Sequence, residues 1–134
     1  MSAESNKAVI LHELEVSNAA FRSMDWIMYD KMMDETYTED TVHHDLSQGK
    51  DMRGRETNKQ SMRRLLKTHP NVRYSLPPDH LIAEGDMVTG LWRLGGTDPA
   101  TGMRGGGVCS KICRFAGGKV AEAWQLTALE EAQK

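Results

Sequence analysis

Apolar residues recur at helical spacing in three segments of the first half of the chain, residues 4–21, 25–37 and 55–68. Recurrence at every third or fourth position places these side chains on one helix face and predicts three amphipathic helices. Ser23-Met24-Asp25 separates the first two, and Pro70 ends the third because proline cannot continue a helix. The apolar faces contain Ile10, Leu14 and Phe21 in the first helix, Trp26, Tyr29, Met33 and Tyr37 in the second, and Met62, Leu65 and Leu66 in the third.

The rest of the chain favours strands, because short runs of β-prone residues alternate with glycine and proline. Residues 38–45 predict a first short strand, and residues 72–83, 87–94, 108–115 and 119–127 predict four more. Pro77-Pro78 cannot donate ladder hydrogen bonds, which predicts a bulge or an edge position there. Residues 47–54 are predicted to form a loop, residues 95–107 a glycine-rich hairpin connection, and residues 84–86 and 116–118 tight turns.

The predicted element order is α-α-β-α-β-β-β-β, with a long-stranded meander after the helices. This order predicts an α+β fold, in which a curved, mixed or largely antiparallel sheet wraps over three helices as a cone. A chain of 134 residues suits a single domain, residues 1–134, with one core. A half-open cone encloses a pocket, so function is expected from the few polar side chains that point inward.

Composition narrows the function classes. Charged residues make up 27% of the chain and apolar residues 39%, as in ordinary globular proteins. The net charge of −2 and the absence of a basic patch argue against nucleic-acid binding. No apolar run is long enough for a membrane span, and the first residues lack the apolar core of a signal peptide, so a cytoplasmic location is expected.

The two cysteines, Cys109 and Cys113, lie four residues apart on one predicted strand. At about 3.3 Å per residue they share a face but are roughly 13 Å apart, too far for a disulfide. We expect both cysteines to be small apolar residues of the core and not to form a metal site.

Three segments carry a family resemblance: residues 37–45 (YTEDTVHHD), 82–88 (IAEGDMV) and 113–124 (CRFAGGKVAEAW). Together they resemble the SnoaL-like polyketide cyclase family of the nuclear transport factor 2-like superfamily. The resemblance covers roughly residues 5–127 and implies the cone-shaped α+β fold. It also implies a range of cofactor-free reactions, from polyketide cyclisation to ketosteroid isomerisation and dehydration, so the fold does not fix the chemistry.

The family's functional positions match this chain unevenly. The cyclases resembled here place an acid/base aspartate directly after the tryptophan of the last strand, where this chain has Gln125. Their partner histidine, or the oxyanion-stabilising acid of the isomerases, corresponds to Lys111 here. The general base of the isomerases corresponds to Asp45, which is a carboxylate in this chain as well.

Strand alternation predicts two inward sets, residues 109, 111 and 113 on one strand and residues 123, 125 and 127 on the next. For Lys111 three interpretations remain open: an ion pair with Asp45 across the pocket, stabilisation of an enolate or carboxylate on a ligand, or a one-residue register shift that turns it to solvent.

Asp45 is either a general base or a strand-end aspartate that caps the following turn. His43 shares its face and is a candidate assistant, whereas His44 points to the other face and is a second candidate. Because neighbouring strand residues face opposite sides, His43, His44 and Asp45 are not expected to bind a metal together.

The predicted function is therefore a pocket for a small apolar organic ligand that carries a carbonyl, with no cofactor. Catalysis would be isomerisation, cyclisation or dehydration. A non-catalytic binding protein and a protein-interaction module are the alternatives. A homodimer is expected through the outer sheet face. The candidate catalytic residues are Asp45, His43, His44 and Lys111, and the candidate ligand contacts are Gln125, Tyr29, Trp26, Trp92, Cys113 and Thr127.

Overall fold

The computed structural model describes residues 2–97 and 104–129 of the chain. Within these residues, three helices and seven strands follow one another in the order α-α-β-β-α-β-β-β-β-β. The elements are α1 Ala3–Ser23, α2 Trp26–Thr36, β1 Tyr37–Asp45, β2 Lys50–Arg53, α3 Arg55–Thr68, β3 Arg73–Tyr74, β4 His80–Glu84, β5 Met87–Thr97, β6 Arg104–Ala116 and β7 Lys119–Leu129.

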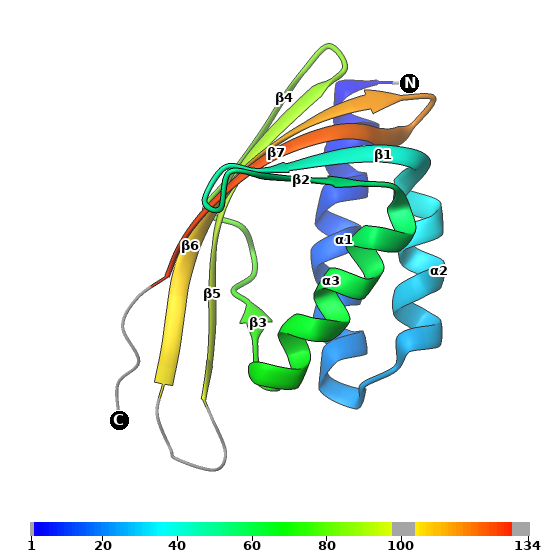
Figure 1. The fold of residues 1–134 in the computed structure, drawn as a ribbon. Coiled ribbons are helices and arrows are strands. Elements are labelled where there is room, and N and C mark those ends of the chain that lie inside the picture. Colours follow the sequence, from blue (N-terminus) through cyan, green and yellow to red (C-terminus); the bar gives the residue numbers. More distant parts are fainter. Residues whose placement is uncertain (1, 98–103, 130–134) are drawn as a thin grey trace.

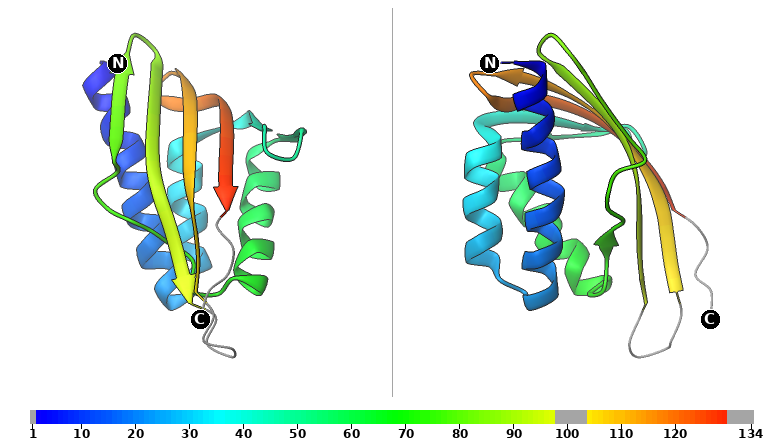
Figure 2. Two further views of the ribbon diagram at one scale, coloured as in Figure 1. Left: turned by 90° about the vertical axis from the view of Figure 1, so that its left-hand side faces the viewer. Right: turned by 180° about the vertical axis from the view of Figure 1, so that it is seen from behind.

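All strands belong to one sheet, whose order is β2-β1-β7-β6-β5-β3, with β4 also paired to β5. Among the paired strands of residues 2–97 and 104–129, β1 and β7 run parallel and the other pairs are antiparallel. The sheet bends strongly, and the three helices lie on its concave side (Figure 1). Two further views show the same arrangement from the side and from behind (Figure 2). The α+β cone predicted from the sequence is confirmed.

Local signals explain where the elements begin and end. Ser2 and Ser5 form a capping box at the start of α1, and the Asp25 side chain accepts a hydrogen bond from the backbone of Met28 at the start of α2. The β6–β7 hairpin turns on Gly117-Gly118, which both have positive φ, as a two-residue turn requires.

The core lies between the concave face and the helices. The inward sides of α1 and α2 meet alternate residues of β5, β6 and β7 there. The fully buried members include Ile10, Leu14 and Phe21 from α1, Tyr29, Met32 and Met33 from α2, and Val88, Cys109, Cys113, Val120 and Ala123 from the sheet.

The structure differs from the sequence prediction at several boundaries. Residues 50–53 form the edge strand β2 instead of a loop, since backbone pairing with β1 needs no apolar alternation. Tyr37 begins β1 rather than ending α2. The predicted strand 72–83 is two short strands, β3 and β4, on either side of Pro77-Pro78.

The glycine-rich connection also differs, because its glycines extend the β5–β6 ladder. Gly95 pairs with Gly106 and Gly96 with Gly105. Residues 98–103 of that predicted connection lie outside the described residues. Within the described part of the chain, no helix has the length and apolarity that a membrane crossing requires.

Candidate functional site

One row of residues crosses the concave face of the sheet. Asp45 on β1 pairs with Gln125 on β7, Gln125 pairs with Lys111 on β6, and Lys111 pairs with Gly90 on β5. At about 4.8 Å between strands, the backbones of Asp45 and Lys111 lie roughly 10 Å apart with Gln125 between them. The three positions that the sequence placed on one face therefore share a single row.

Lys111 points inward and is buried, with 6% of its surface exposed. Its ammonium donates a hydrogen bond of 2.5 Å to the Tyr37 hydroxyl, which in turn donates to Oε2 of Glu13. The Lys111 Nζ lies 3.9 Å from Oε1 of Glu13. The expected partner was Asp45, but the carboxylate that faces Lys111 comes from α1.

This pairing keeps Lys111 charged inside the protein. Burial alone would lower the pKa of Lys111, but the negative charge of Glu13 outweighs it, and the pKa lies above its ordinary value. Burial and Glu13 raise the pKa of Tyr37 well above its ordinary value, so its hydroxyl stays protonated. The arrangement is a cation, a neutral phenol and a carboxylate in sequence.

An ammonium group has three hydrogen atoms to donate. Among the described residues, Lys111 gives one to Tyr37, and Oε1 of Glu13 is beyond hydrogen-bond distance. The Lys111 Nζ also lies 5.1 Å from the centre of the Tyr37 ring. The ammonium therefore retains donor capacity that an oxygen atom of a ligand can use.

His43 lies on the same inner face, 9% exposed, and its side chain is hydrogen-bonded to Gln125. Burial, followed by the positive charge of Lys111, lowers the pKa of His43 to about 3. The imidazole is consequently neutral at neutral pH, where it can donate or accept a hydrogen bond but is a weak base.

Asp45 caps the turn that follows β1. Its Oδ1 accepts hydrogen bonds from the backbone of Ser47, at 3.0 Å, and of Gln48, at 3.2 Å. No described residue is hydrogen-bonded to Oδ2. The turn therefore holds the carboxylate in place through one oxygen atom and leaves the other available.

His44 lies on the outer face of the sheet, away from the row. Its ring nitrogens contact Asp51 and Glu122, each at 2.7 Å, and the ring stacks on Trp124. Hydrogen bonds to Glu122 and then to Asp51 raise the pKa of His44 above its ordinary value. The structure does not bring His44 together with Asp45, His43 and Lys111.

The candidate ligand contacts occupy different depths. Cys113 and Trp92 are buried on the inner face next to the row, and Thr127 is half-buried and accepts a hydrogen bond from the Gln125 amide. Tyr29 is buried in the core, in edge-to-face contact with Trp26. The Trp26 ring packs against the Arg63 guanidinium in a cation–π contact, where α2 faces α3.

Sequence reasoning missed the roles of Glu13 and Tyr37. Both were part of helical patterns, with Tyr37 assigned to an apolar helix face. A signal for Glu13 was present, because its spacing from Ile10, Leu14 and Ser17 places a carboxylate on the buried face of α1.

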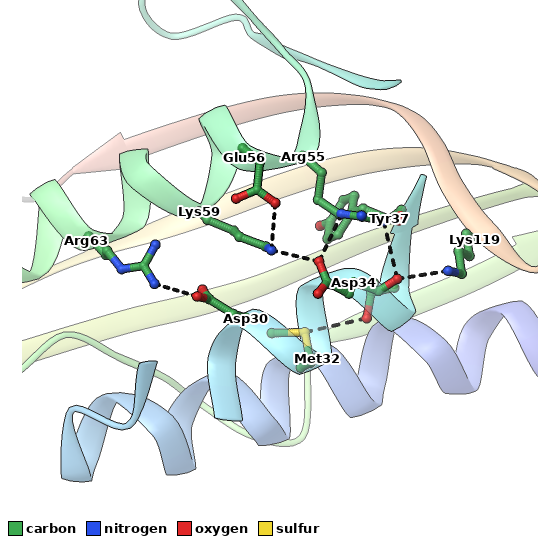
Figure 3. A network of polar contacts seen from close by, with 10 residues as sticks. Asp30, Met32, Asp34, Tyr37, Arg55, Glu56, Lys59, Arg63 and Lys119 are labelled. Carbon is green, nitrogen blue, oxygen red and sulfur yellow. Dashed lines mark hydrogen bonds and ion pairs between the residues drawn. The ribbon is translucent and has the colours of Figure 1, made fainter. Parts of the chain in front are cut away.

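A second polar network joins α2 to α3 (Figure 3). Lys59 contacts Asp34 at 2.7 Å and Glu56 at 2.8 Å, while Arg63 contacts Asp30 at 2.6 Å. The two carboxylates that contact Lys59, those of Asp34 and Glu56, are 49% and 70% exposed. This network therefore links two helices at the edge of the protein.

A cavity of about 300 Å³ lies at the far end of the sheet, at the β4–β5 and β6–β7 turns. It is lined by Asn6, Gly85, Asp86, Phe115, Gly117 and Gly118. None of the residues predicted for the site lines it. Among the described residues, no group of three or more histidine, cysteine, aspartate or glutamate side chains is arranged to hold a metal ion.

Comparison with known structures places the fold. AclR, a candidate hydroxylase from Streptomyces galilaeus, is 22% identical, with a TM-score of 0.72 over 94% of this chain and 80% of that chain. IdmH, a candidate polyketide cyclase from Streptomyces antibioticus, is 18% identical, with a TM-score of 0.69 over 87% of this chain and 89% of that one. At these identities the likeness concerns the fold alone.

A third similar structure is a candidate ketosteroid isomerase from Kribbella flavida. It is 15% identical, with a TM-score of 0.63 over 98% of this chain and 82% of that chain. No curated protein matches the sequence. Residues 14–123, which include Asp45 and Lys111 but not Gln125, match the SnoaL-like domain family, and the chain belongs to that family.

Proposed function

We propose that the chain binds a small, largely apolar organic molecule with a carbonyl group against the concave face and performs cofactor-free acid/base chemistry on it. The observation that carries this proposal is the buried, charged Lys111, held by Tyr37 and Glu13 with donor capacity to spare. Burying a cation is costly. Placed where an enolate oxygen would develop, such a cation stabilises the transition state.

In this proposal each polar side chain of the row, together with His43, has one role. The free oxygen of Asp45 removes a proton from the carbon next to the carbonyl. The C–H electron pair forms the enolate double bond, and the carbonyl π pair moves to oxygen, where Lys111 donates a hydrogen bond. Gln125 and the neutral His43 orient the substrate between them.

The enolate then determines the outcome. Return of the proton at another carbon gives isomerisation, attack on a second carbonyl gives cyclisation, and loss of a neighbouring hydroxyl as water gives dehydration. Each outcome needs only proton transfer and the substrate's own electrons. The named cyclase and isomerase among the similar structures are in keeping with this class of reaction.

The test follows exchange of the α-hydrogen atoms of α-tetralone, an enolisable bicyclic ketone, for deuterium in heavy water by NMR. Asp45→Asn keeps an oxygen that can cap the turn but cannot take a proton, so exchange should fall by about 10²–10⁴-fold. Asp51→Asn, on the adjacent strand and the outer face, is the matched control and should retain exchange. Full exchange in Asp45→Asn would show that Asp45 is not the base.

Non-catalytic binding is the second candidate, favoured by Gln125 at the position where the related cyclases carry an aspartate. In that case α-tetralone binds to the wild-type protein, calorimetry detects it, and no exchange above the buffer rate occurs. Lys111 then serves to hold the carbonyl oxygen of a ligand that leaves unchanged.

We further propose that a second copy of the chain covers the outer face of the sheet. Ile82, Thr89, Ile112 and Trp124 form one row across four strands of that face. Ile82 is 60% exposed, Ile112 41% and Leu126 52%. Two-fold pairing would bury this apolar stripe against its own counterpart.

Ile112→Glu should convert a dimer to a monomer in sedimentation experiments, because it places a charge in the middle of the stripe. Ile27→Glu is the matched control, since Ile27 is 86% exposed but lies on α2, on the helical side. A wild-type protein that sediments as a monomer at micromolar concentration would rule out the dimer.

A further inference from the structure

Four buried side chains around the inner core have polar atoms without a hydrogen-bond partner among the described residues. They belong to residues of four different elements, and each residue, with its backbone included, exposes no more than 9% of its surface. The atoms are Oε1 of Glu13 on α1, Oγ1 of Thr41 on β1, both amide atoms of Asn58 on α3, and Nε1 of Trp92 on β5.

Asn58 is the most unusual of them. It belongs to the buried stripe of α3 together with Leu66, two turns further along. The next residue, Lys59, contacts Asp34 of α2 and Glu56 of its own helix, whereas neither amide atom of Asn58 has a partner in the described chain.

Asn58 also lies close to Thr41. The backbone of Gly54 donates to the carbonyl of Thr41 at 2.8 Å, and the backbone of Asn58 donates to the carbonyl of Gly54 at 3.4 Å. Asn58 is thus one helical turn from the residue that ties α3 to β1. Thr41 is 1% exposed and belongs to the same buried side of β1 as His43.

Folded proteins satisfy nearly all of their buried polar groups, so each unsatisfied one needs a cause. Leucine at position 58 and valine at position 41 would fill the same space without that penalty. The polar atoms therefore point to a function that an apolar core would not supply.

We propose that these atoms recognise a ligand that carries a hydroxyl group as well as a carbonyl, and that Asn58 and Thr41 determine this specificity. The inference rests on the proposed function, because it adds a hydroxyl requirement to the same ligand. Trp92 Nε1 can only donate, so it calls for a ligand acceptor such as a carbonyl oxygen. Oε1 of Glu13 accepts, so it calls for a donor such as a hydroxyl. The Asn58 amide and the Thr41 hydroxyl can do both.

The experiment compares tetralin, α-tetralone and 5-hydroxy-α-tetralone by calorimetry on the full chain. These probes share one apolar frame and add the carbonyl and the hydroxyl in turn. We expect the wild-type protein to bind the hydroxylated ketone about tenfold or more tightly than α-tetralone, because a site with unpaired polar groups rejects a ligand that cannot satisfy them. The indole N–H resonance of Trp92 should shift when either ketone binds and stay in place with tetralin.

Asn58→Leu and Thr41→Val should each reduce the hydroxyl advantage to about threefold or less, because the apolar side chains no longer distinguish the two ketones. Thr38→Val is the matched control. Thr38 also has an unpartnered hydroxyl on β1, but it is adjacent to the inward-facing Tyr37 and so belongs to the other face of the strand. Thr41→Val keeps the side-chain shape, so it remains informative if Asn58→Leu disturbs the fold.

If the wild-type protein binds both ketones equally, or if the two variants keep the full advantage, the polar atoms bind ordered water only and the inference is wrong. That result would leave the proposed function intact, since α-tetralone would still bind. A protein that binds none of the three probes would overturn both.

Discussion

Two lysines of this chain are almost equally buried but lie in different surroundings. The Lys59 side chain is 5% exposed and that of Lys111 is 6% exposed. Lys59 meets two carboxylates at hydrogen-bond distance, and these are 49% and 70% exposed to water (Figure 3). Lys111 meets one phenol and one carboxylate that is itself 12% exposed and 3.9 Å away.

The difference shows that burial alone does not identify a functional cation. Lys59 forms ion pairs at hydrogen-bond distance with Asp34 and Glu56, and its contact with Asp34 joins α3 to α2. Lys111 is enclosed with a minimal counter-charge and incomplete hydrogen bonding, an arrangement that contributes little to stability for what it costs. Such a group is better explained by a ligand than by folding.

The largest expected difference between the two lysines is in stability. Lys111→Met leaves Glu13 as an uncompensated buried charge and should lower the free energy of unfolding by about 3–5 kcal/mol. Lys59→Met, whose acidic partners reach water, should lower it by about 1 kcal/mol or less. Urea denaturation of both variants measures the contrast.

The double variant Glu13→Gln/Lys111→Met removes both charges and should recover most of the loss. Equal costs for Lys111→Met and Lys59→Met would mean that the two environments are equivalent, and the comparison would fail.

Removal of one hydroxyl should have the next largest effect. Tyr37→Phe takes a hydrogen bond from both Lys111 and Glu13 and should lower the free energy of unfolding by about 1–3 kcal/mol. Tyr29→Phe is the matched control, because Tyr29 is equally buried but its hydroxyl makes no hydrogen bond within the described residues. A smaller effect at Tyr37 than at Tyr29 would argue against the relay through the phenol.

The smallest difference between variants is expected in pH dependence, which reports the burial of His43 and the charge of Lys111. The pKa of His43 is lowered from 6.5 to about 3, so in that range the unfolded state binds a proton that the native state does not. Stability should therefore fall as the pH drops below about 6.5, by at most about 1.4 kcal/mol per pH unit from this group.

NMR titration of the imidazoles tests this attribution. In Glu13→Gln/Lys111→Met the His43 pKa should rise because the charge of Lys111, the second-largest cause of its lowering after burial, is gone, while in Lys59→Met it should stay unchanged. His44 provides an internal reference of opposite sign, since its raised pKa adds stability that is lost as the pH rises through it. A wild-type His43 that titrates near its ordinary pKa would contradict both its burial and the cation beside it.

The sequence predicted those parts of the fold that depend on short-range patterns. Helix α3 was predicted with the bounds 55–68 because Met62, Leu65 and Leu66 recur at helical spacing and Pro70 follows, although Leu65 is 39% exposed in the structure. The edge strand β2 was missed because Lys50-Asp51-Met52-Arg53 is exposed on both faces and has no apolar alternation to detect. Its pairing depends on backbone atoms that every sequence shares.

The candidate site shows the same division. Alternation along β6 and β7 correctly predicted that Lys111 and Gln125 face inward, because one face of a sheet is set by local phase. The identity of the partner of Lys111 was not predictable in this way, since Glu13 approaches from a helix at the opposite end of the sequence. Which carboxylate meets a buried cation depends on how the helices lie across the sheet.

The parallel pairing of β1 with β7 determines when the candidate site can form during synthesis of the chain. β7 is synthesised after the other strands that the structure describes, yet it separates β1 from β6 and supplies the middle of the row. Before β7 has been translated, His43 on β1 and Lys111 on β6 are present, but the strand that lies between them in the sheet is missing. The candidate site therefore forms in one late step, after residues 119–129 have left the ribosome and paired with β1 and β6.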